Sequence, residues 1–455
     1  MSFHAVVIGG GLSGLATFIL LRRAGLEVLV VEEERFPRAR VGESLDWAAP
    51  GLLESLGVSL GSLVRDQSAT YKRGLRIINP EGPGGTSYCA GPKDWFGGWP
   101  FWLQTTTLRV DRPRLDARLL ELALESGVTV EWDRVTKLEA EANTVRRCTT
   151  SRGSVLTASW FLDASGRARV LGRALRIPVE HYGKRKVGVW TYFDTTPSSA
   201  ATTVYMDNAA PYLKWIWEIP VSPRRTSVGC IVPADQFRDL NESGGDTWSA
   251  VAGELSRHER FARLLADNPT PEFYTCSYRS YVSREASGPN WFLLGEAAAL
   301  PDPLTANGVT AALRHAHEAT RLIVSATRGD SGRGTIPVED LRLYTARVRM
   351  MGHAFNHNIE RAIYDRSMRA GLGPLRAEKL YTWFAYPANA LYSRHPPCEG
   401  KSVLRFEKGL RAVEAWIDVW ARIGAVAATL RGGLGTRPEA PVAAGRDAGA
   451  PGTSG

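Results

Sequence analysis

The chain has 455 residues, of which 44% are hydrophobic and 23% are charged, the composition of an ordinary globular protein. This length is enough for a large core and for more than one structural unit. Lysine and arginine number 56 against 47 aspartate and glutamate, which gives a formal net charge of +9, spread along the chain. Because no basic block is interleaved with aromatic residues, the composition argues against a nucleic-acid partner and leaves anionic cofactors open.

The cysteines are odd in number, stand far apart and form no C-x-x-C pair. This pattern favours reduced thiols, and hence a cytoplasmic location, over a framework of disulfides. The N-terminus has an apolar run but lacks a basic leader and a cleavage signature, so we expect no signal peptide. The cysteines are Cys89, Cys148, Cys230, Cys276 and Cys398.

The segment that most resembles a membrane span is residues 410–430. It carries Glu414, Asp418 and Arg422, which are costly at the centre of a bilayer. We therefore expect no transmembrane segment, but an amphipathic helix that docks on the protein's own core or lies on a membrane surface.

Apolar patterns predict an α/β chain that begins with a βαβ unit: a buried strand at residues 4–8, a helix at 12–24 and a second buried strand at 28–31. Later elements alternate in type, and a helical region closes the chain. In chain order they are a helix at 114–126, strands at 128–132 and 159–163, several strands within 186–232, a strand at 291–294, a helix at 309–326 and mostly helix from 338 to about 430.

A glycine-rich turn, G-G-G-L-S-G at residues 9–14, joins the first strand to its helix. Gly9 permits the tight turn, Gly11 lets the backbone approach a pyrophosphate, and Gly14 lets helix and strand pack closely. Glu32 ends the second strand, where a carboxylate accepts hydrogen bonds from a ribose. Together these features predict a dinucleotide site, with the pyrophosphate at the positive end of the helix.

Two later segments favour a flavin over a nicotinamide. F-L-D-A-S-G-R at residues 161–167 follows a strand, and G-E-A-A-A-L-P-D-P-L-T-A-N-G at 295–308 opens a second helix at Gly308. A second helix N-terminus set against a bound ring system favours negative charge on a reduced flavin. The sequence therefore predicts FAD as the cofactor.

The stretch K-W-I-W-E-I-P-V-S, residues 214–222, predicts a strand with two large rings. A period of two places Trp215, Trp217 and Ile219 on one face. Because proline has no amide proton to donate, we expect Pro220 to stop the ladder. By itself the pattern is typical of a half-buried core strand.

With these motifs the chain resembles the flavin-dependent halogenases, a branch of the glutathione-reductase-like, hydroxylase-type FAD fold. The resemblance covers about residues 3–326. It rests on the glycine turn with Glu32, on R-V-G-E-S at residues 40–44, on F-L-D-A-S-G, on G-E-A-A with D-P-L-T-A-N-G, and on W-I-W-E-I-P, which fits the family's W-x-W-x-I-P signature. The resemblance implies that this tryptophan strand lies near the flavin and discourages monooxygenase chemistry.

Members of the family use reduced FAD, oxygen and halide to form hypohalous acid, which travels down a tunnel to a lysine beside the substrate. That lysine follows the G-E-S segment by roughly thirty residues, and Lys72 stands 29 residues after Glu43. The resemblance thus implies that Lys72 is the catalytic residue, which positions hypohalous acid or becomes a haloamine. Without the surrounding motifs, Lys72 reads as a solvated lysine on a strand.

The chain also departs from the family pattern. Tryptophan halogenases carry a glutamate and a serine just before the helix glycine, whereas here the segment 303–308 is P-L-T-A-N-G. This difference favours phenols or pyrroles over indoles as substrates. The amides of Asn307 and Gly308 remain able to hold halide at the helix N-terminus. Glu296 replaces the usual aspartate that holds the ribityl chain.

The predicted architecture is a Rossmann-like FAD-binding domain interleaved with a mostly β substrate domain, plus a helical C-terminal region. Residues 1–70, 103–185 and 275–330 form the FAD-binding domain, residues 71–102 and 186–274 the substrate domain, residues 331–435 the helical region and residues 436–455 a disordered tail. The residues assigned to FAD or halide are Gly9, Gly11, Leu12, Ser13, Gly14, Glu32, Glu33, Arg40, Ser44, Arg109, Glu296, Pro303, Asn307 and Gly308; Lys72 is assigned to catalysis, and Trp215, Trp217, Ile219 and Pro220 to the wall of the site.

Some signals stay ambiguous. Arg109 and Arg112 either reach an FAD phosphate or lie on an exposed face. His353, His357 and Glu360 share a helix face at a spacing that metals use, but nothing else supports a metal, and we expect none. The aromatic stretch at residues 94–102 either stacks a substrate or forms a packed loop.

Our leading interpretation is a halogenase of an electron-rich aromatic compound, which is free or tethered to a carrier protein. No second dinucleotide fold for NADPH is evident, so reduced flavin would come from a separate flavin reductase. The alternatives are a flavin monooxygenase, a lipid-reducing enzyme of the geranylgeranyl reductase type, and a degenerate flavoprotein that only binds partners. The intact glycine turn with Glu32 argues against the last of these.

Overall fold

A computed structural model describes most of the first 364 residues. The described residues are 2–35, 40–46, 48–72, 75–79, 86–90, 107–207, 212–244, 246–268, 271–328, 334–352, 356–357, 359–364 and the single positions 419, 423 and 426. The aromatic stretch at 94–102, His353, the tail 436–455 and all but those three positions of the predicted helix at 410–430 lie outside the described residues. Among the described residues, no helix is long and apolar enough to span a membrane.

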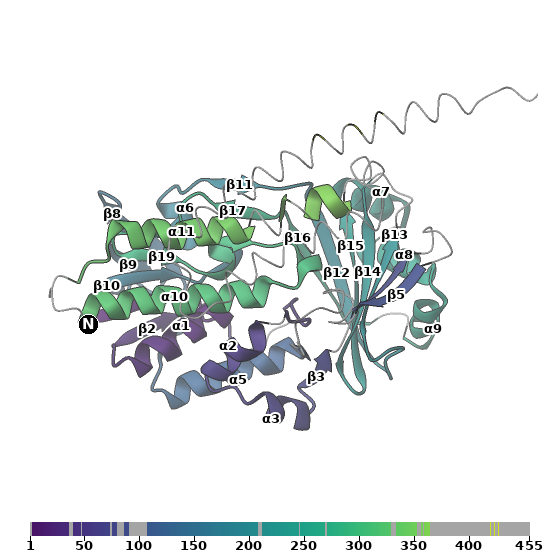
Figure 1. The fold of residues 1–455 in the computed structure, drawn as a ribbon, viewed down its shortest axis with the longest axis horizontal. Coiled ribbons are helices and arrows are strands. Elements are labelled where there is room, and N and C mark those ends of the chain that lie inside the picture. Colours follow the sequence, from purple (N-terminus) through teal and green to yellow (C-terminus); the bar gives the residue numbers. More distant parts are fainter. Residues whose placement is uncertain are drawn as a thin grey trace, which may run out of the picture.

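An eight-stranded sheet forms one end of the molecule (Figure 1). Its central strands are parallel and run in the order β19-β10-β1-β2-β7. Strand β18 adds an antiparallel edge, and the β8–β9 hairpin joins β10. The strands are β1 (Ser2–Ile8), β2 (Val28–Val31), β7 (Thr129–Glu131), β8 (Val135–Glu141), β9 (Thr144–Thr150), β10 (Val155–Asp163), β18 (Ser287–Gly288) and β19 (Trp291–Leu293). The predicted βαβ start is confirmed.

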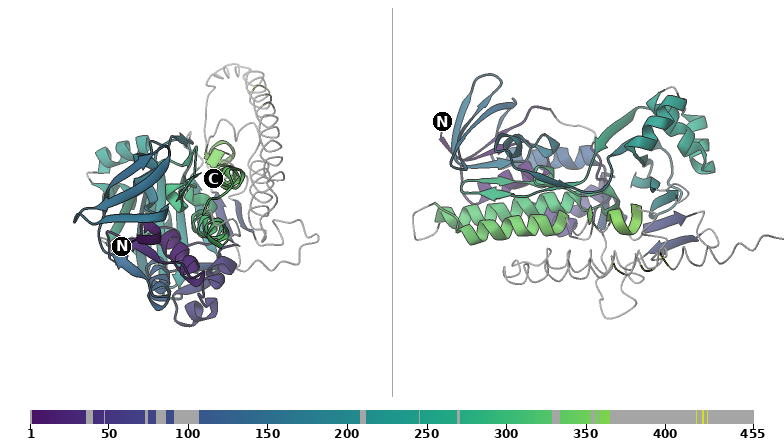
Figure 2. Two further views of the ribbon diagram at one scale, coloured as in Figure 1. Left: turned by 90° about the vertical axis from the view of Figure 1, so that its left-hand side faces the viewer. Right: turned by 90° about the horizontal axis from the view of Figure 1, so that it is seen from above.

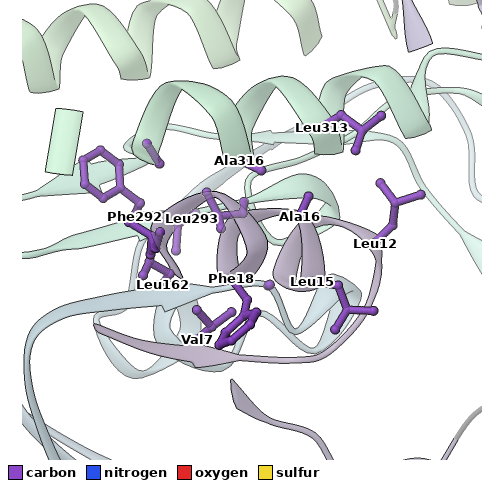
Figure 3. Packing of buried hydrophobic residues seen from close by; sticks show 14 of the residues in the cluster. Val7, Leu12, Leu15, Ala16, Phe18, Leu162, Phe292, Leu293, Leu313 and Ala316 are labelled. Carbon is purple, nitrogen blue, oxygen red and sulfur yellow. The ribbon is translucent and has the colours of Figure 1, made fainter. Parts of the chain in front are cut away.

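Helices cover this sheet because its central strands are apolar on both faces. They are α1 (Leu12–Arg23), α5 (Arg112–Glu125), α10 (Gly308–Arg328) and α11 (Val338–Gly352), with the short helices α2 (Ala49–Ser55), α3 (Leu60–Arg65) and α6 (Val170–Ala174). Helices α10 and α11 lie side by side along the sheet (Figures 1 and 2). In the core, Ala316 of α10 faces Ala16 of α1, and Phe18 points to the opposite side of α1 (Figure 3).

The other end of the molecule is a seven-stranded sheet in the order β16-β12-β15-β14-β13-β4-β5, antiparallel except where β13 meets β4. Its strands are β4 (Leu75–Asn79), β5 (Thr86–Ala90), β12 (Lys186–Asp194), β13 (Thr202–Asp207), β14 (Lys214–Ser222), β15 (Arg225–Pro233) and β16 (Phe273–Tyr278). Helices α7 (Ala234–Gly244), α8 (Thr247–Ser256) and α9 (Glu259–Asp267) lie at this end (Figure 1). The domain boundary predicted at residue 275 falls inside β16, which pairs with β12.

The remaining described strands form two small sheets. Strands β3 (Ala69–Lys72) and β6 (Thr107–Val110) form an antiparallel ribbon. Strands β11 (Val179–His181), β17 (Tyr281–Ser283) and β20 (Ala299–Leu300) form a three-stranded sheet.

Strand β14 carries the twin tryptophans as predicted. Trp215, Trp217 and Ile219 share one buried cluster, whereas Ile216 belongs to the cluster on the opposite face, with Trp248 and other residues of α8 and α9. The alternation of faces is thereby confirmed.

The prediction that Pro220 stops the ladder is wrong. Pro220 pairs with Thr226 of β15, and β14 continues to Ser222 after a shift in register. The ladder therefore tolerates the proline in register, and the shift comes only after it, between Pro220 and Ser222.

Candidate active site

The predicted flavin motifs leave the parallel sheet at one edge. Ile8 pairs in register with Val31 on one side and Asp163 on the other, and Asp163 pairs with Leu293. Each of these residues ends its strand, so the glycine turn, Glu32, A-S-G and G-E-A-A all begin at the carboxyl edge. In open α/β sheets this edge is where ligands bind.

The glycine turn is packed too tightly for side chains. Gly9 has φ +101°, and a Cβ there would lie 2.5 Å from the carbonyl oxygen of Ala164. A Cβ on Gly14 would lie 1.9 Å from the carbonyl oxygen of Gly9. The glycine turn therefore packs directly against the A-S-G segment, and α1 lies so close to the end of β1 that only glycine fits at the contact.

The N-terminus of α1 is free to receive an anion. Gly11 is its N-cap, no side chain in the described part of the chain caps it, and its first turn holds no acidic residue. Glu32 is buried beside the turn, where its carboxylate accepts hydrogen bonds from the amide of Gly10 at 2.5 Å and the amide of Glu34 at 2.8 Å. Uncapped amides and an adjacent carboxylate are the groups that an FAD pyrophosphate and ribose need, so these residues fit the cofactor.

The G-E-A-A segment closes on the same helix. Gly295 has φ +53°, and a Cβ there would lie 2.9 Å from the hydroxyl oxygen of Ser13. The amide of Gly295 donates to Nδ1 of the buried His315 at 3.1 Å. Burial lowers the pKa of His315 to about 3, so the imidazole is neutral and serves as an acceptor.

Glu296 is half-exposed at this edge. Its carboxylate lies 3.9 Å from the guanidinium of Arg167 and 3.8 Å from the position that a Cβ would take on Gly166. The side chain therefore faces A-S-G, and its contact with a ribityl chain stays a prediction.

The loop before α10 is anchored by Asp302. This buried carboxylate accepts hydrogen bonds from the amide of Leu304 at 3.0 Å and from the hydroxyl of Tyr364 at 3.0 Å. Pro303 is half-buried in the following turn, and Ala306 adopts the left-handed conformation, φ +56°, just before the helix.

Asn307 stands at the start of this helix with its side chain buried. Only 2% of the residue is exposed, and among the described residues its Oδ1 has no hydrogen-bond partner. A buried acceptor left unsatisfied is costly, and a bound group with N–H donors would relieve the cost. The first turn of α10, which begins at Gly308, holds no acidic residue. This arrangement fits a flavin and a halide at the helix start.

The segment R-V-G-E-S joins the flavin edge to the tryptophan strand. The buried carboxylate of Glu43 accepts hydrogen bonds from Tyr192 at 3.0 Å and Ser227 at 3.1 Å. The hydroxyl of Ser227 in turn accepts one from Nε1 of Trp217 at 3.0 Å. Trp217 packs against Trp215 with ring centroids 5.6 Å apart.

Gly229, which pairs with Trp217 across β14 and β15, leaves room for the indole. A Cβ at Gly229 would lie 2.3 Å from Cζ2 of Trp217 and 2.5 Å from Cβ of Trp190. We expect Gly229→Ala to displace the indole and lower the free energy of unfolding by about 1–3 kcal/mol. Denaturant unfolding measures this loss, and Gly253→Ala in α8, where a Cβ meets nothing within 4 Å, is the control. An unchanged midpoint would mean that Trp217 does not occupy this position.

Lys72 ends β3 and is half-buried. Its Nζ donates a hydrogen bond to the carbonyl oxygen of Leu45, next to the G-E-S segment, at 3.0 Å. The same strand is tied to the tryptophan strand, because the hydroxyl of Thr70 donates to the carbonyl oxygen of Pro220 at 2.7 Å. Lys72 therefore points into the protein, between the two predicted motifs, and does not read as a solvated lysine.

Arg109 pairs with Thr70 in the ribbon and is buried. Its guanidinium donates to the carbonyl oxygens of Tyr71 and Ala200, the latter at 2.8 Å. Arg112 is also buried and donates to the carbonyl oxygen of Val41 at 2.8 Å. The exposed-face interpretation of these arginines is wrong, because the ribbon and the R-V-G-E-S segment cover them. A phosphate contact of Arg109 stays a prediction.

Three other assigned residues lie nearer the surface. Arg40 is exposed and pairs with Glu34 at 3.4 Å, and Glu33 is exposed and lies 4.0 Å from Arg134. Ser44 is half-buried and forms a bridge with Arg109. Their contact with FAD stays a prediction.

A buried charge cluster escaped the sequence analysis. Lys186 is fully buried between Asp302, at 3.1 Å, and Glu360, and its Nζ lies 4.0 Å from the ring centroid of Tyr364. Tyr364 also accepts a hydrogen bond from Nε1 of Trp215 at 2.8 Å. Glu360, which the sequence placed in a metal-like pattern, is thus a partner of Lys186, and the described residues contain no group of side chains suited to a metal.

Comparison with known proteins agrees with this geometry. The family described as tryptophan halogenase matches residues 4–90 and 104–330. A tryptophan 2-halogenase of Chondromyces crocatus is 28% identical over 340 residues, 72% of this chain and 62% of that protein. A 1H-pyrrole-2-carbonyl-(peptidyl-carrier protein) chlorinase of Pseudomonas fluorescens is 26% identical over 358 residues, 72% of this chain and 77% of that protein. The chain spans less than two thirds of the first relative's length.

Solved structures share the fold. The flavin-dependent brominase Bmp2 superposes with a TM-score of 0.69 at 20% identity, covering 91% of this chain and 100% of that one. The FAD-dependent halogenase CndH, from a myxobacterium, superposes with a TM-score of 0.63 at 24% identity, covering 78% of this chain and 80% of that one. The family match extends over well more than half of the chain and includes every flavin motif described above. The chain belongs to the tryptophan halogenase family, the flavin-dependent halogenases.

Proposed function

We propose that this protein halogenates an electron-rich aromatic compound, a phenol or a pyrrole, using FADH2, O2 and halide. The observation that carries the proposal is the position of Lys72, half-buried and hydrogen-bonded to the segment that follows G-E-S. A lysine held inside the protein at this place has no evident task in folding, because its desolvation is costly.

Bound FADH2 would supply two electrons for the oxidation of halide by O2, with hypohalous acid, water and FAD as the products. The residues of this chain bind the cofactor and the halide and orient them. The amides at the start of α1 hold the pyrophosphate, and Glu32 holds a ribose. The amides of Asn307 and Gly308 hold halide at the start of α10, and the wall of Trp215 and Trp217 excludes water from the site.

At the other end of the site, Lys72 receives hypohalous acid beside the substrate. As an ammonium group it donates a hydrogen bond to the oxygen of hypohalous acid, which makes the halogen more electrophilic. Because burial lowers the pKa of Lys72 to about 8, an enzyme that needs the ammonium form loses activity as the pH rises through that value.

The substrate class follows from what the chain lacks and from its relatives. The P-L-T-A-N-G segment has no glutamate to activate an indole. Phenols and pyrroles carry their own activating heteroatom and need none. One relative is a chlorinase, and another a brominase, of pyrrole-2-carbonyl carried on a peptidyl-carrier protein, which supports a carrier-bound substrate here.

The proposal extends to the surroundings of the enzyme. A separate flavin reductase supplies the FADH2, since no second dinucleotide turn is evident in the sequence. The cysteines Cys148, Cys230 and Cys276 are free thiols, in keeping with a cytoplasmic location.

The proposal is tested by incubating the protein with FAD, a flavin reductase, NADH and bromide, together with phenols, pyrroles and indoles, free and carrier-bound. We expect a phenol or pyrrole product with the isotopic doublet of bromine in its mass spectrum. A product that gains oxygen whether or not bromide is present would instead identify a monooxygenase. PqsL of Pseudomonas aeruginosa, whose structure is described as that of a probable FAD-dependent monooxygenase, shares this fold with a TM-score of 0.65 at 19% identity. Saturation of a prenyl chain without oxygen would identify a lipid reductase.

A further inference from the structure

Asp46, two residues after the G-E-S segment, is a buried carboxylate that no sequence pattern singled out. Only 7% of the residue is exposed. Its Oδ1 accepts hydrogen bonds from the amides of Ala48 at 3.0 Å and Ala49 at 3.2 Å, and from the hydroxyl of Thr310. Its Oδ2 is buried and has no hydrogen-bond partner among the described residues. A buried carboxylate oxygen without a partner is unfavourable, and a cation or a hydrogen-bond donor would stabilise it.

The contacts of Asp46 link Lys72 to the start of α10. Lys72 donates to the carbonyl oxygen of Leu45, the residue next to Asp46, at 3.0 Å. Thr107, which pairs with Lys72 across the β3–β6 ribbon, donates to the carbonyl oxygen of Asp46 at 2.6 Å. Thr310 lies two residues beyond Gly308, in the first turn of α10. Asp46 thus stands between the lysine and the helix end assigned to flavin and halide.

The charges around the pair act in opposite directions. Burial lowers the pKa of Lys72 to about 8; the charge of Asp46 opposes that fall, and Arg109 on β6 adds to it. Burial raises the pKa of Asp46, whereas the hydrogen bonds from Thr310 and the two amides, and the charge of Arg314 on α10, oppose the rise.

The other elements packed against β3 are α3 and β14. Arg65 of α3 is exposed, and Lys214 and Glu218 of β14 have ion-pair partners elsewhere, Lys214 with Asp207 and Glu254 and Glu218 with Arg260. Among the described residues, the negative charge that raises the pKa of Lys72 is that of Asp46.

We propose that Asp46 is the acidic partner of Lys72, a positioning residue that keeps the lysine in its ammonium form and fixes it relative to the first turn of α10. This inference rests on the proposed function. In the reaction, the halogen of hypohalous acid bonds to a ring carbon as its bond to oxygen breaks. The leaving hydroxide takes a proton from the ammonium group of Lys72 and becomes water. The proton lost from the ring carbon then returns to the amine, which restores the ammonium group.

The pairing is tested in the flavin-free protein, so that the readout does not depend on turnover. The rate at which a trace of acetic anhydride labels Lys72 is followed against pH by peptide mass spectrometry, which is practical because the chain has nine lysines. In the wild type the labelling midpoint should lie near pH 8. In Asp46→Asn it should move to lower pH, with labelling at pH 7 increased by about threefold or more, because the amine loses the anion that held its proton.

Two further variants secure the result. Thr310→Val removes the hydroxyl that stabilises the charge of Asp46 and should move the midpoint of Lys72 in the same direction, even if Asp46→Asn fails to fold. Asp194→Asn, at the exposed end of β12, is the control and should leave the midpoint unchanged. A midpoint that stays at the wild-type pH in both Asp46→Asn and Thr310→Val would overturn the inference.

Activity then separates the two proposals. With reduced flavin and bromide, the pH at which bromination declines should fall in Asp46→Asn in parallel with the labelling midpoint. If the labelling shifts but the wild type brominates nothing, the proposed function fails and the pairing stands. If the wild type brominates and the labelling does not shift, the proposed function stands and the pairing fails.

Discussion

Replacement of Lys72 by methionine should abolish bromine incorporation while the flavin is still oxidised. Methionine fills much of the same space but cannot donate a hydrogen bond to hypohalous acid or form a haloamine. Its thioether consumes only one equivalent of hypobromous acid, on oxidation to the sulfoxide. Removing a group that acts on the reacting atoms costs about 100-fold or more in rate. Hypobromous acid should still form at the flavin and leak into solution, where a colorimetric halogen trap detects it while product mass records the lost bromination.

The fold should tolerate this change. Because burial lowers the pKa of Lys72 to about 8, the folded chain carries a buried ammonium group below that pH, which costs stability. The cost to the free energy of unfolding shrinks as the pH rises from about 8 toward the ordinary lysine pKa, and at pH 7 it applies in full. Because Lys72→Met removes this cost, thermal melting at pH 7 should show the variant to be at least as stable as the wild type. Lys72→Arg, which keeps the charge but not the geometry, is the matched variant. Full bromination by Lys72→Met would remove Lys72 from the mechanism.

Replacement of Gly14 by alanine should give the second large effect, loss of FAD binding. A Cβ at Gly14 would lie 1.9 Å from the carbonyl oxygen of Gly9, a backbone atom that cannot rotate away. Either α1 moves off the strand or the turn opens, and both displace the amides that face the pyrophosphate. We expect about a tenfold or greater loss of FAD affinity and a loss of about 1–3 kcal/mol in the free energy of unfolding.

Quenching of flavin fluorescence measures the affinity, and thermal melting measures the stability. Gly253→Ala is again the control, since α8 has room for the methyl group and alanine favours a helix. If Gly14→Ala bound FAD as tightly as the control, the pyrophosphate would not lie at this turn.

Much of the flavin edge could be predicted because it depends on local chemistry. A short apolar strand followed by a glycine-rich turn and a helix is typical of a dinucleotide site. Parallel strands bring their carboxyl ends to one edge of the sheet, so the motifs that follow them meet there. The predicted strand at residues 28–31 is β2 itself, and Gly9, A-S-G and G-E-A-A meet as the register of β1, β10 and β19 requires. The faces of β14 followed in the same way from its period of two.

The polar interior could not be predicted, since it depends on partners far apart in the chain. Lys186 and Glu360 are separated by 174 residues, and neither has a sequence pattern that marks it as buried. Asp46 and Arg109 are likewise charged residues that usually lie at the surface. Arg109 is held inside by strand pairing: in the β3–β6 ribbon it lies opposite Thr70, and it also forms a bridge with Ser44.

Pro220 shows the limit of a rule applied to one residue. Proline cannot donate to a ladder, yet Pro220 pairs with Thr226 and the strand continues past it to Ser222. Its carbonyl oxygen remains free to accept, and Thr70 of the Lys72 strand donates to it at 2.7 Å. The proline therefore does not end the tryptophan strand but joins it to β3.

A crystal structure of the protein with FAD and bromide tests the central claim most directly. Our account predicts the flavin ring between the glycine turn and α10, anomalous scattering from bromide at the amides of Asn307 and Gly308, and a passage from the ring along Trp215 and Trp217 that ends at Nζ of Lys72. A flavin ring with no passage to Lys72, or a lysine turned to bulk solvent in the complex, would contradict it.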